Sequence, residues 1–377
     1  MINILLKGPL FSNCGYGYHS RQVYMYLKSR ENVKIHCKIL NWGNNPWLYS
    51  NIIDEIEKDI LLYENTKFDE SYQIQFPFEW EKVSDFDVGI TAGIESNYCN
   101  PDMIHYINKM DKVIVPSNFS KNTFLNTSKL YNKEITTQIS VIKESFHQEL
   151  LEENEESAIL QDIKTNFNFL VFGQFNSLSE LNDRKNILKT IRVLVDTFKN
   201  NEEVGIILKT NLSNNSKLNL NRCKEILKNN FPKNNRKCKL YLIHGNISNS
   251  DINNIYKDKK IKALVSGTRS EGFGLVHLES AASGLPIITT NWSGYLDFLE
   301  DNFLKVKYDL VKCPSNNLFC EESKWAEFNS DSMKKKLLTL YKNYDLYKEN
   351  SMELKNKIIQ EYNLNAIIDT YKIKFKE

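Results

Sequence analysis

Two glutamates placed around a pair of glycines are the residues of this sequence best suited to binding a charged ligand. Glu271 stands directly before the first glycine, and Glu279 follows eight positions later. The apolar run 263–266 predicts a strand before them, and the stretch that ends at Gly284, with a proline soon after, predicts a helix. This helix would begin at the carboxyl end of a strand, where open α/β sheets bind ligands.

The start of the predicted helix has the chemistry of an anion site. Its unpaired backbone N–H groups and the positive end of its dipole suit a diphosphate, and the glycines let the ligand come close. The residues that would contribute these groups are Gly272, Phe273, Gly274 and Leu275. At about 1.5 Å of rise per residue, Glu279 would lie roughly 7 to 9 Å further along, within reach of ribose hydroxyls, while Glu271 would face a sugar. A capped helix with two solvated glutamates is the alternative interpretation.

Apolar runs that alternate with helical patterns predict α/β structure in both halves of the chain. In the first half, strands are expected at 2–6, 33–40, 88–93 and 112–116, with a loop over 11–17 and a helix over 19–28. In the second half, strands are expected at 169–172, 205–208, 240–243, 263–266 and 286–289, with helices such as 186–198 between them. The segment 41–80 gives mixed signals and no assignment.

The length of 377 residues is too great for one ordinary core, so two domains are expected. The acidic stretch 150–157 buries little and predicts the boundary between them. We therefore expect an N-terminal domain over 1–155, a second domain over 156–350 and a C-terminal helix over 351–377.

Composition narrows the classes of protein to consider. The chain has 49 basic and 47 acidic residues, so its formal charge of +2 gives no global field for nucleic acid or an anionic membrane. Its seven cysteines lack the spacing of metal ligands and indicate reduced thiols. No stretch reaches the ~18 apolar residues that a membrane span needs. We expect a soluble, cytoplasmic protein without a transmembrane segment or a metal site, and peripheral membrane contact stays open.

The acidic motif and three other stretches resemble a known family. The run from Glu271 to Glu279, followed by 282–286, is similar to the signature of family-4-like retaining glycosyltransferases. The other stretches that agree in order and spacing are 14–17, 111–117 and 172–174 with 183–186. The resemblance implies the GT-B fold, with two doubly wound Rossmann-like domains facing a central cleft. It also implies a helical C-terminal tail that can cross back to the N-terminal domain.

The same resemblance implies a role for each charged candidate in the second domain. Lys185, helped by Arg184, would hold the diphosphate of a sugar-nucleotide donor. Glu279 would bind the ribose, and Glu271 the hydroxyls of the transferred sugar. Because these cations and the helix end neutralise charge, no metal is needed.

Two departures from the family pattern affect other candidates. The family often has an arginine directly after the glycine of the first C-terminal loop, where this chain has Gln174, so Arg184 would have to supply that charge. Many members also carry a histidine near the cleft after an N-terminal strand, and here Glu95 is the nearest polar candidate for a catalytic or positioning role. The N-terminal loop would contribute Gly15 and Gly17 to the donor site.

The function that follows is transfer of a hexose from a nucleoside-diphosphate sugar, UDP- or GDP-linked, to an acceptor hydroxyl, with retention and without a cofactor. One alternative is a GT-B-like sugar-nucleotide epimerase, which needs no second substrate. Another is a non-catalytic protein that binds a nucleotide sugar or nucleic acid and shows no turnover. The segment 244–246 follows a strand and could place backbone groups near the nucleotide base, although a plain turn fits as well. The acceptor stays open among glycan, lipid, protein and modified nucleic acid, as does the oligomeric state.

Overall fold

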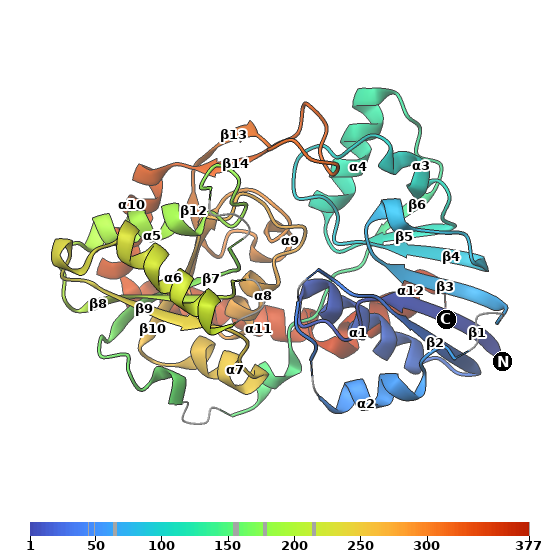
Figure 1. Ribbon diagram of the computed structural model, residues 1–377, viewed down its shortest axis with the longest axis horizontal. Helices are drawn as coiled ribbons and strands as arrows, with labels where there is room; N and C mark the ends of the chain where they lie inside the picture. The colour runs from blue at the N-terminus through green and yellow to red at the C-terminus, as the bar shows by residue number, and fades with distance from the viewer. Residues whose placement is uncertain are drawn as a thin grey trace. The chain divides into compact units, whose positions relative to one another are not determined.

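The computed structural model describes residues 1–43, 45–48, 50–62, 66–153, 158–175, 179–212 and 216–376. Its contacts divide the chain into two compact units. Unit 1 comprises Met1–Ser145, Ser315–Ser323 and Tyr362–Glu377, and unit 2 comprises Phe146–Pro314 and Lys324–Glu361. Each unit contains a parallel sheet of six strands (Figure 1), which confirms the predicted pair of doubly wound domains.

The sheet of unit 1 has the strand order β2-β1-β3-β4-β5-β6. Its strands are β1 (Ile2–Gly8), β2 (Val33–Ile39), β3 (Phe68–Ile74), β4 (Ser84–Ile90), β5 (Lys112–Val115) and β6 (Gln138–Val141). The central strands are buried on both faces, as parallel sheets covered by helices require. For the same reason β1 and β5 are mainly apolar, whereas β3 and β4 carry polar residues in their less buried first halves.

Helices cover this sheet and leave the carboxyl ends of its strands to loops. They are α1 (Gly15–Lys28), α2 (Asn51–Lys58), α3 (Met103–Ile107), α4 (Asn118–Tyr131) and, from the end of the chain, α12 (Leu364–Phe375). One apolar cluster joins β1 and β3 to α1 and α12, and another joins β5 to α3 and α4. The helix predicted over 19–28 begins earlier, at Gly15.

The sheet of unit 2 has the strand order β12-β11-β10-β7-β8-β9. Its strands are β7 (Phe167–Phe172), β8 (Val204–Thr210), β9 (Lys239–His244), β10 (Ile261–Ser266), β11 (Ile287–Thr290) and β12 (Leu304–Val306). A separate antiparallel pair consists of β13 (Tyr308–Lys312) and β14 (Lys324–Phe328). The reversal of strand order beside β7 and β10 creates the switch point at which such sheets bind ligands.

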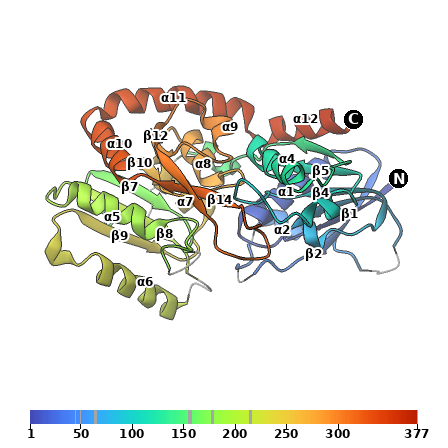
Figure 2. The same ribbon diagram turned by 90° about the horizontal axis from the view of Figure 1, so that it is seen from above.

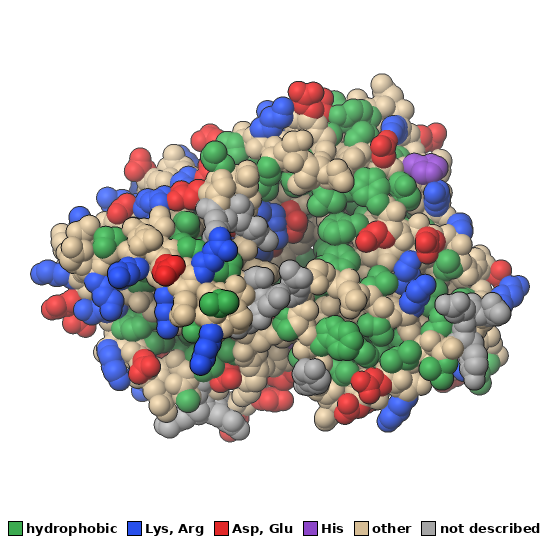
Figure 3. All heavy atoms as spheres, in the orientation of Figure 1, with side chains coloured by type: hydrophobic (Ala, Val, Ile, Leu, Met, Phe, Trp, Pro, Cys, Tyr) green, Lys and Arg blue, Asp and Glu red, His purple; other side chains and the backbone are tan. Residues whose placement is uncertain are grey.

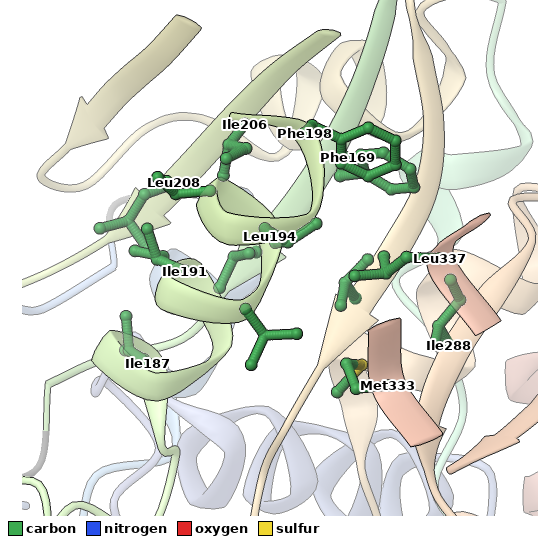
Figure 4. Close-up of a cluster of buried hydrophobic side chains, with 14 of the residues drawn as sticks. Phe169, Ile187, Ile191, Leu194, Phe198, Ile206, Leu208, Ile288, Met333 and Leu337 are labelled. Carbon is green, nitrogen blue, oxygen red and sulfur yellow. The ribbon is translucent and has the colours of Figure 1, made fainter. Parts of the chain in front are cut away.

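The core of unit 2 lies between its sheet and three of its helices. The helices of this unit are α5 (Ile187–Phe198), α6 (Lys217–Asn230), α7 (Asn249–Lys257), α8 (Leu275–Ala282), α9 (Leu296–Leu299), α10 (Ser330–Lys342) and α11 (Tyr344–Glu361). Figure 4 shows Ile191 and Leu194 of α5 beside Leu208 of β8, and Leu337 of α10 belongs to the same cluster. Figure 2 shows α10 and α11 following one another along one side of the unit. On the opposite face of the sheet, α8 packs against α11 through Ser351, whose hydroxyl donates to the Gly284 carbonyl at 2.9 Å.

The chain passes from unit 1 to unit 2 at Ser145 and Phe146. The predicted boundary between residues 155 and 156 lies outside the described residues, since 154–157 are not among them. Residues before that point already pack in unit 2, because Asn253 and Asn249 of α7 donate to the backbone and side chain of Glu149 at 2.9 and 2.8 Å. The tail expected over 351–377 is divided, with α11 in unit 2 and α12 in unit 1.

Charged side chains are mixed over the surface of unit 2. On the face shown in Figure 3, Lys and Arg side chains are interspersed with Asp and Glu, in keeping with the small net charge. Within the described ranges, no helix has both the length and the apolar character needed to cross a membrane.

Candidate donor site

The loop that joins β10 to α8 carries Glu271 into the interior of unit 2. A Cβ at Gly294 would lie 2.0 Å from the carbonyl oxygen of Gly272, so only glycine fits at position 294. The Gly294 N–H and the Ser293 hydroxyl donate to the Glu271 carbonyl at 3.0 and 2.6 Å. The segment after β11 therefore fixes the backbone on which Glu271 stands.

The carboxylate of Glu271 is held by two cations. Lys185 Nζ lies 2.6 Å from one oxygen, and Arg184 Nη1 lies 3.2 Å from the other. The Thr268 hydroxyl donates at 2.8 Å to the oxygen that Lys185 contacts. Burial opposes ionisation, but the charges of Lys185 and Arg184 outweigh it and hold the pKa of Glu271 far below its ordinary value. Glu271 is therefore a carboxylate at neutral pH, and one anion with two cations leaves the cluster with a charge of +1.

The two cations come from the segment between β7 and α5, which Arg269 anchors. The Arg269 guanidinium donates to the backbone carbonyls of Glu180 and Asp183 at 2.8 and 2.9 Å, and it forms an ion pair with Glu327 at 2.5 Å. Arg269 is 4% exposed and stands two residues before Glu271. It thereby connects the loop of the glutamate to the segment of the cations.

Helix α8 begins without a side-chain cap. Gly274 is the N-cap residue, with a φ of 101° that a residue with a side chain rarely adopts. The first N–H groups of a helix have no partner within it, so this start presents donors and a positive dipole end. Phe273 packs against Phe298 with ring centroids 5.3 Å apart, so its side chain belongs to the core.

Glu279 lies on α8 one turn beyond Leu275, and its side chain is 5% exposed. His147 Nδ1 contacts one carboxylate oxygen, and the Tyr256 hydroxyl donates to the other at 3.1 Å. His147 comes from the segment that opens unit 2, and Tyr256 comes from α7. Because two carboxylate oxygens can accept about four hydrogen bonds, Glu279 keeps the capacity to accept from a ligand.

The candidates of the first half of the chain lie together in unit 1. A Cβ at Gly17 would lie 1.9 Å from the Ser12 carbonyl oxygen, whereas one at Gly15 would meet nothing within 4 Å. Between them, the Tyr16 hydroxyl lies 2.9 Å from Thr91 Oγ1 and accepts from the Ala92 N–H at 3.2 Å. The first turn of α1 is thus bonded to the segment after β4 that leads to the partly buried Glu95.

Unit 2 therefore brings together the candidates that the sequence predicted for it. These are Arg184, Lys185, Glu271, Gly272, Phe273, Gly274, Leu275 and Glu279. Sequence reasoning missed the contributions of His147, Tyr256 and Arg269. Nothing local marks the first two, because they reach Glu279 from segments 132 and 23 positions away.

Two six-stranded parallel sheets with flanking helices, and a site at the carboxyl edge of the second, are the architecture of GT-B glycosyltransferases. Residues 177–349 match the family model described as glycosyl transferases group 1. The chain therefore has the GT-B fold, and just under half of its sequence is similar to the group 1 glycosyl transferases. No curated protein matches its sequence.

Solved structures of glycosyltransferases share this fold over the whole chain. A glycosyltransferase from Rickettsia africae ESF-5 has a TM-score of 0.63 at 16% identity, with 100% of this chain and 97% of that chain covered. Anabaena Alr3699/HepE in complex with UDP and glucose has a TM-score of 0.63 at 11% identity, with both chains covered completely. Sucrose-phosphate synthase (tll1590) from Thermosynechococcus elongatus has a TM-score of 0.63 at 12% identity, with 100% and 98% covered. At these identities the similarity is one of fold.

Proposed function

We propose that this chain transfers a hexose from a UDP- or GDP-linked donor to an acceptor hydroxyl, with retention of anomeric configuration and without a metal. The observation that carries the proposal is the ionised Glu271 between Lys185 and Arg184, directly before the uncapped start of α8. A cluster with a charge of +1 beside a helix N-terminus attracts a diphosphate, and a buried carboxylate in the same cluster accepts from sugar hydroxyls.

Each group of the donor then has a partner in unit 2. The diphosphate lies against the N–H groups at the start of α8, with Lys185 and Arg184 on its other side. Glu279 accepts hydrogen bonds from the ribose, held in place by His147 and Tyr256. Glu271 accepts from hydroxyls of the transferred sugar. Unit 1 supplies the acceptor side, with Glu95 as a positioning carboxylate, and it contributes Gly15 and Gly17 of the first turn of α1 to donor binding.

In the reaction, the bond between the anomeric carbon and the diphosphate oxygen breaks, and a bond to the acceptor oxygen forms on the same face. The transition state has oxocarbenium character, and negative charge grows on the leaving diphosphate. Lys185, Arg184 and the α8 N–H groups are already oriented, so they stabilise that charge without reorganising. The leaving phosphate takes the proton of the acceptor hydroxyl. Glu271, with its low pKa, cannot act as the acid.

The known structures support the choice of donor. Alr3699/HepE, which shares the fold over its whole length, was solved with UDP and with UDP-glucose. A uridine donor is therefore the first to test, and a guanosine donor the second.

The substitution Glu271→Gln tests the proposed division of roles. Removing the carboxylate raises the cluster's charge from +1 to +2, so binding of the nucleoside diphosphate alone should be retained or tightened. Turnover of the sugar nucleotide should fall by about 100-fold or more, because the hydrogen bonds to the sugar are lost. Calorimetric titration with UDP and GDP and release of the nucleoside diphosphate from UDP- and GDP-hexoses measure the two quantities.

Glu300→Gln is the matched control, because Glu300 also pairs with a cation of unit 2, Lys357, but at the exposed surface. It should leave both binding and turnover unchanged. Turnover of the Glu271→Gln variant at the wild-type rate would contradict the role of Glu271. Interconversion of the sugar nucleotide without an acceptor would instead indicate an epimerase.

A further inference from the structure

A buried lysine at the carboxyl end of β8 has no role in the site described so far. Lys209 is 3% exposed, and its Nζ donates to the Gly245 carbonyl at 2.8 Å and to Asn211 Oδ1 at 3.0 Å. An ammonium group has three N–H donors, and both of these acceptors are neutral. In the part of the chain that the structure describes, no carboxylate lies within ion-pair distance of Lys209 and no third acceptor is placed for it. Burial lowers its pKa to about 8, so it is still mostly charged at neutral pH.

The surroundings of Lys209 connect it to Glu279. The ammonium lies 5.4 Å from the ring centroid of Phe172. That ring stacks on Tyr256, with centroids 5.9 Å apart and an interplanar angle of 26°, and the Tyr256 hydroxyl bonds to Glu279. Two aromatic rings therefore separate the proposed ribose carboxylate from a buried cation on the same face of the sheet.

The space beside Lys209 is open at Gly245. This residue has a φ of 102°, and a Cβ there would meet nothing within 4 Å. The neighbouring His244 has its pKa lowered by burial and by the charge of Lys209, so it stays neutral, and its buried Nε2 has no hydrogen-bond partner among the described residues. Among the described residues, none therefore lies close to this position, which is next to an ammonium with one N–H still to satisfy.

Distance separates Lys209 from the proposed diphosphate. The diphosphate lies at the end of β10, and β8 is two strands away in the order β10-β7-β8. At about 4.8 Å per strand spacing, the two positions are roughly 10 Å apart. The part of a nucleoside diphosphate that extends this far past the ribose is the base.

We propose that Lys209 selects the base of the donor by donating a hydrogen bond to an exocyclic carbonyl oxygen. This inference rests on the proposed function, since it takes the ribose to lie at Glu279. An ammonium can only donate, so a base with an oxo group at this edge, such as uracil or guanine, satisfies it. A base with an amino group there, such as cytosine or adenine, leaves the buried cation facing another donor.

The test compares matched nucleotides that differ at this exocyclic group and at the adjoining ring nitrogen. Calorimetric titration of the wild-type protein should show UDP binding about 10-fold or more tighter than CDP, and IDP about 10-fold or more tighter than ADP. Lys209→Met removes the ammonium but keeps the length of the side chain, and it should reduce both ratios to near one. Lys209→Arg keeps a donor and should preserve part of the preference.

Lys224→Met is the control for net charge, because Lys224 is an exposed residue of α6. It should leave both ratios unchanged. The proposal is overturned if the wild type shows no preference within either pair of nucleotides. This outcome is measured on the wild type alone, so it can be read even if Lys209→Met fails to fold. It is also overturned if Lys209→Met keeps the preference, or weakens all four nucleotides equally as a phosphate contact would. If instead the proposed function is wrong, the wild type should bind none of the four nucleotides, and this result is distinct from a loss of preference among them.

Discussion

At the scale of single residues, two buried glutamates are held in opposite protonation states by their neighbours. Glu271 is ionised because Lys185 and Arg184 lie against it. Glu144, in unit 1, has no such cation: burial raises its pKa to about 8, and the nearby His19, 3.5 Å away, has its pKa lowered by burial to about 4. Near neutral pH this second pair is therefore largely uncharged.

The Glu144 pair predicts a pH dependence of stability. Its folded pKa of about 8 exceeds the ordinary 4.5, so the folded state binds the proton more tightly and loses stability as pH rises towards 8. His19 acts in the opposite direction only between about 4 and 6.5. Between pH 6.5 and 8 the free energy of unfolding of unit 1 should therefore fall by about 2 kcal/mol in the wild type.

The substitution Glu144→Gln should abolish this fall and make unit 1 more stable than the wild type at pH 8. Urea unfolding at several pH values measures it, with the exposed Glu55→Gln as the control that keeps the wild-type slope. An unchanged slope in Glu144→Gln would show that the carboxyl group is not buried in its neutral form.

Sequence reasoning found the site residues that lie within one local pattern. Glu271, the glycine turn and Glu279 share a single strand-to-helix segment, so their spacing alone predicts their relation. His147 and Tyr256 reach Glu279 from the segment that opens unit 2 and from α7, and a local pattern does not encode such distant contacts. The expectation that Arg184 replaces the charge missing at Gln174 also did not anticipate that Arg184 pairs with Glu271.

At the scale of elements, the start of α1 shows that packing against a distant part of the chain can outweigh the low helix propensity of glycine. Glycine is a poor helix former, so the sequence predicts a helix only from residue 19. The helix begins at Gly15 because the chain from Pro9 to Ser12 passes directly against its first turn. Only a residue without a side chain fits at position 17.

The two glycines of this turn predict opposite responses to alanine. Gly17→Ala should cost several kcal/mol of unit 1 stability, because its Cβ would lie 1.9 Å from a backbone oxygen that cannot move alone. Gly15→Ala should change stability by less than about 1 kcal/mol, since its Cβ meets nothing and alanine favours the helix. Thermal unfolding of the two variants side by side measures the difference, and equal losses would contradict the close packing at position 17.

Strands with a mainly apolar sequence were easier to predict than strands interrupted by charged residues. Strands β7 to β11 of unit 2 are mainly apolar and were found within a few residues, whereas β12, only three residues long, was not predicted. Strand β3 was missed because Asp69 and Glu70 interrupt its pattern, although its last four residues are buried. The short strands β13 and β14 pair only with each other across a loop, and no periodicity marks them.

At the scale of the whole molecule, the chain returns twice to unit 1 after building unit 2. Residues 315–323 bond to unit 1 through the Asn100 N–H, which donates to the Leu318 carbonyl at 2.8 Å. Helix α12 packs on α1, where Tyr371 stacks on Tyr26 with centroids 4.7 Å apart. Alternating strands and helices predicted two α/β domains, but which late segments join the first domain depends on these distant contacts.

The return of α12 predicts that a change near the C-terminus weakens unit 1 and spares the donor site. Tyr371 is 1% exposed, so Tyr371→Ala should cost about 3–5 kcal/mol in the unfolding of unit 1. Ile373 of the same helix is 74% exposed, and Ile373→Ala should be within about 0.5 kcal/mol of the wild type. Unfolding measured with and without bound nucleotide distinguishes the transition of unit 2, which should shift with nucleotide, from that of unit 1. Loss of nucleotide binding in folded Tyr371→Ala would contradict the assignment of α12 to unit 1.

The central claim is that unit 2 binds the nucleoside diphosphate of a sugar donor across the start of α8 and Glu279. Calorimetric titration of the wild type and Glu279→Ala with UDP and GDP tests it most directly, with the exposed Glu225→Ala as a control on the same unit. We expect one of the two nucleotides to bind the wild type and the control equally, and to bind Glu279→Ala about 10-fold or more weakly, because two ribose hydrogen bonds to a carboxylate are lost. Binding that is absent in the wild type, or unchanged in Glu279→Ala, would contradict the claim.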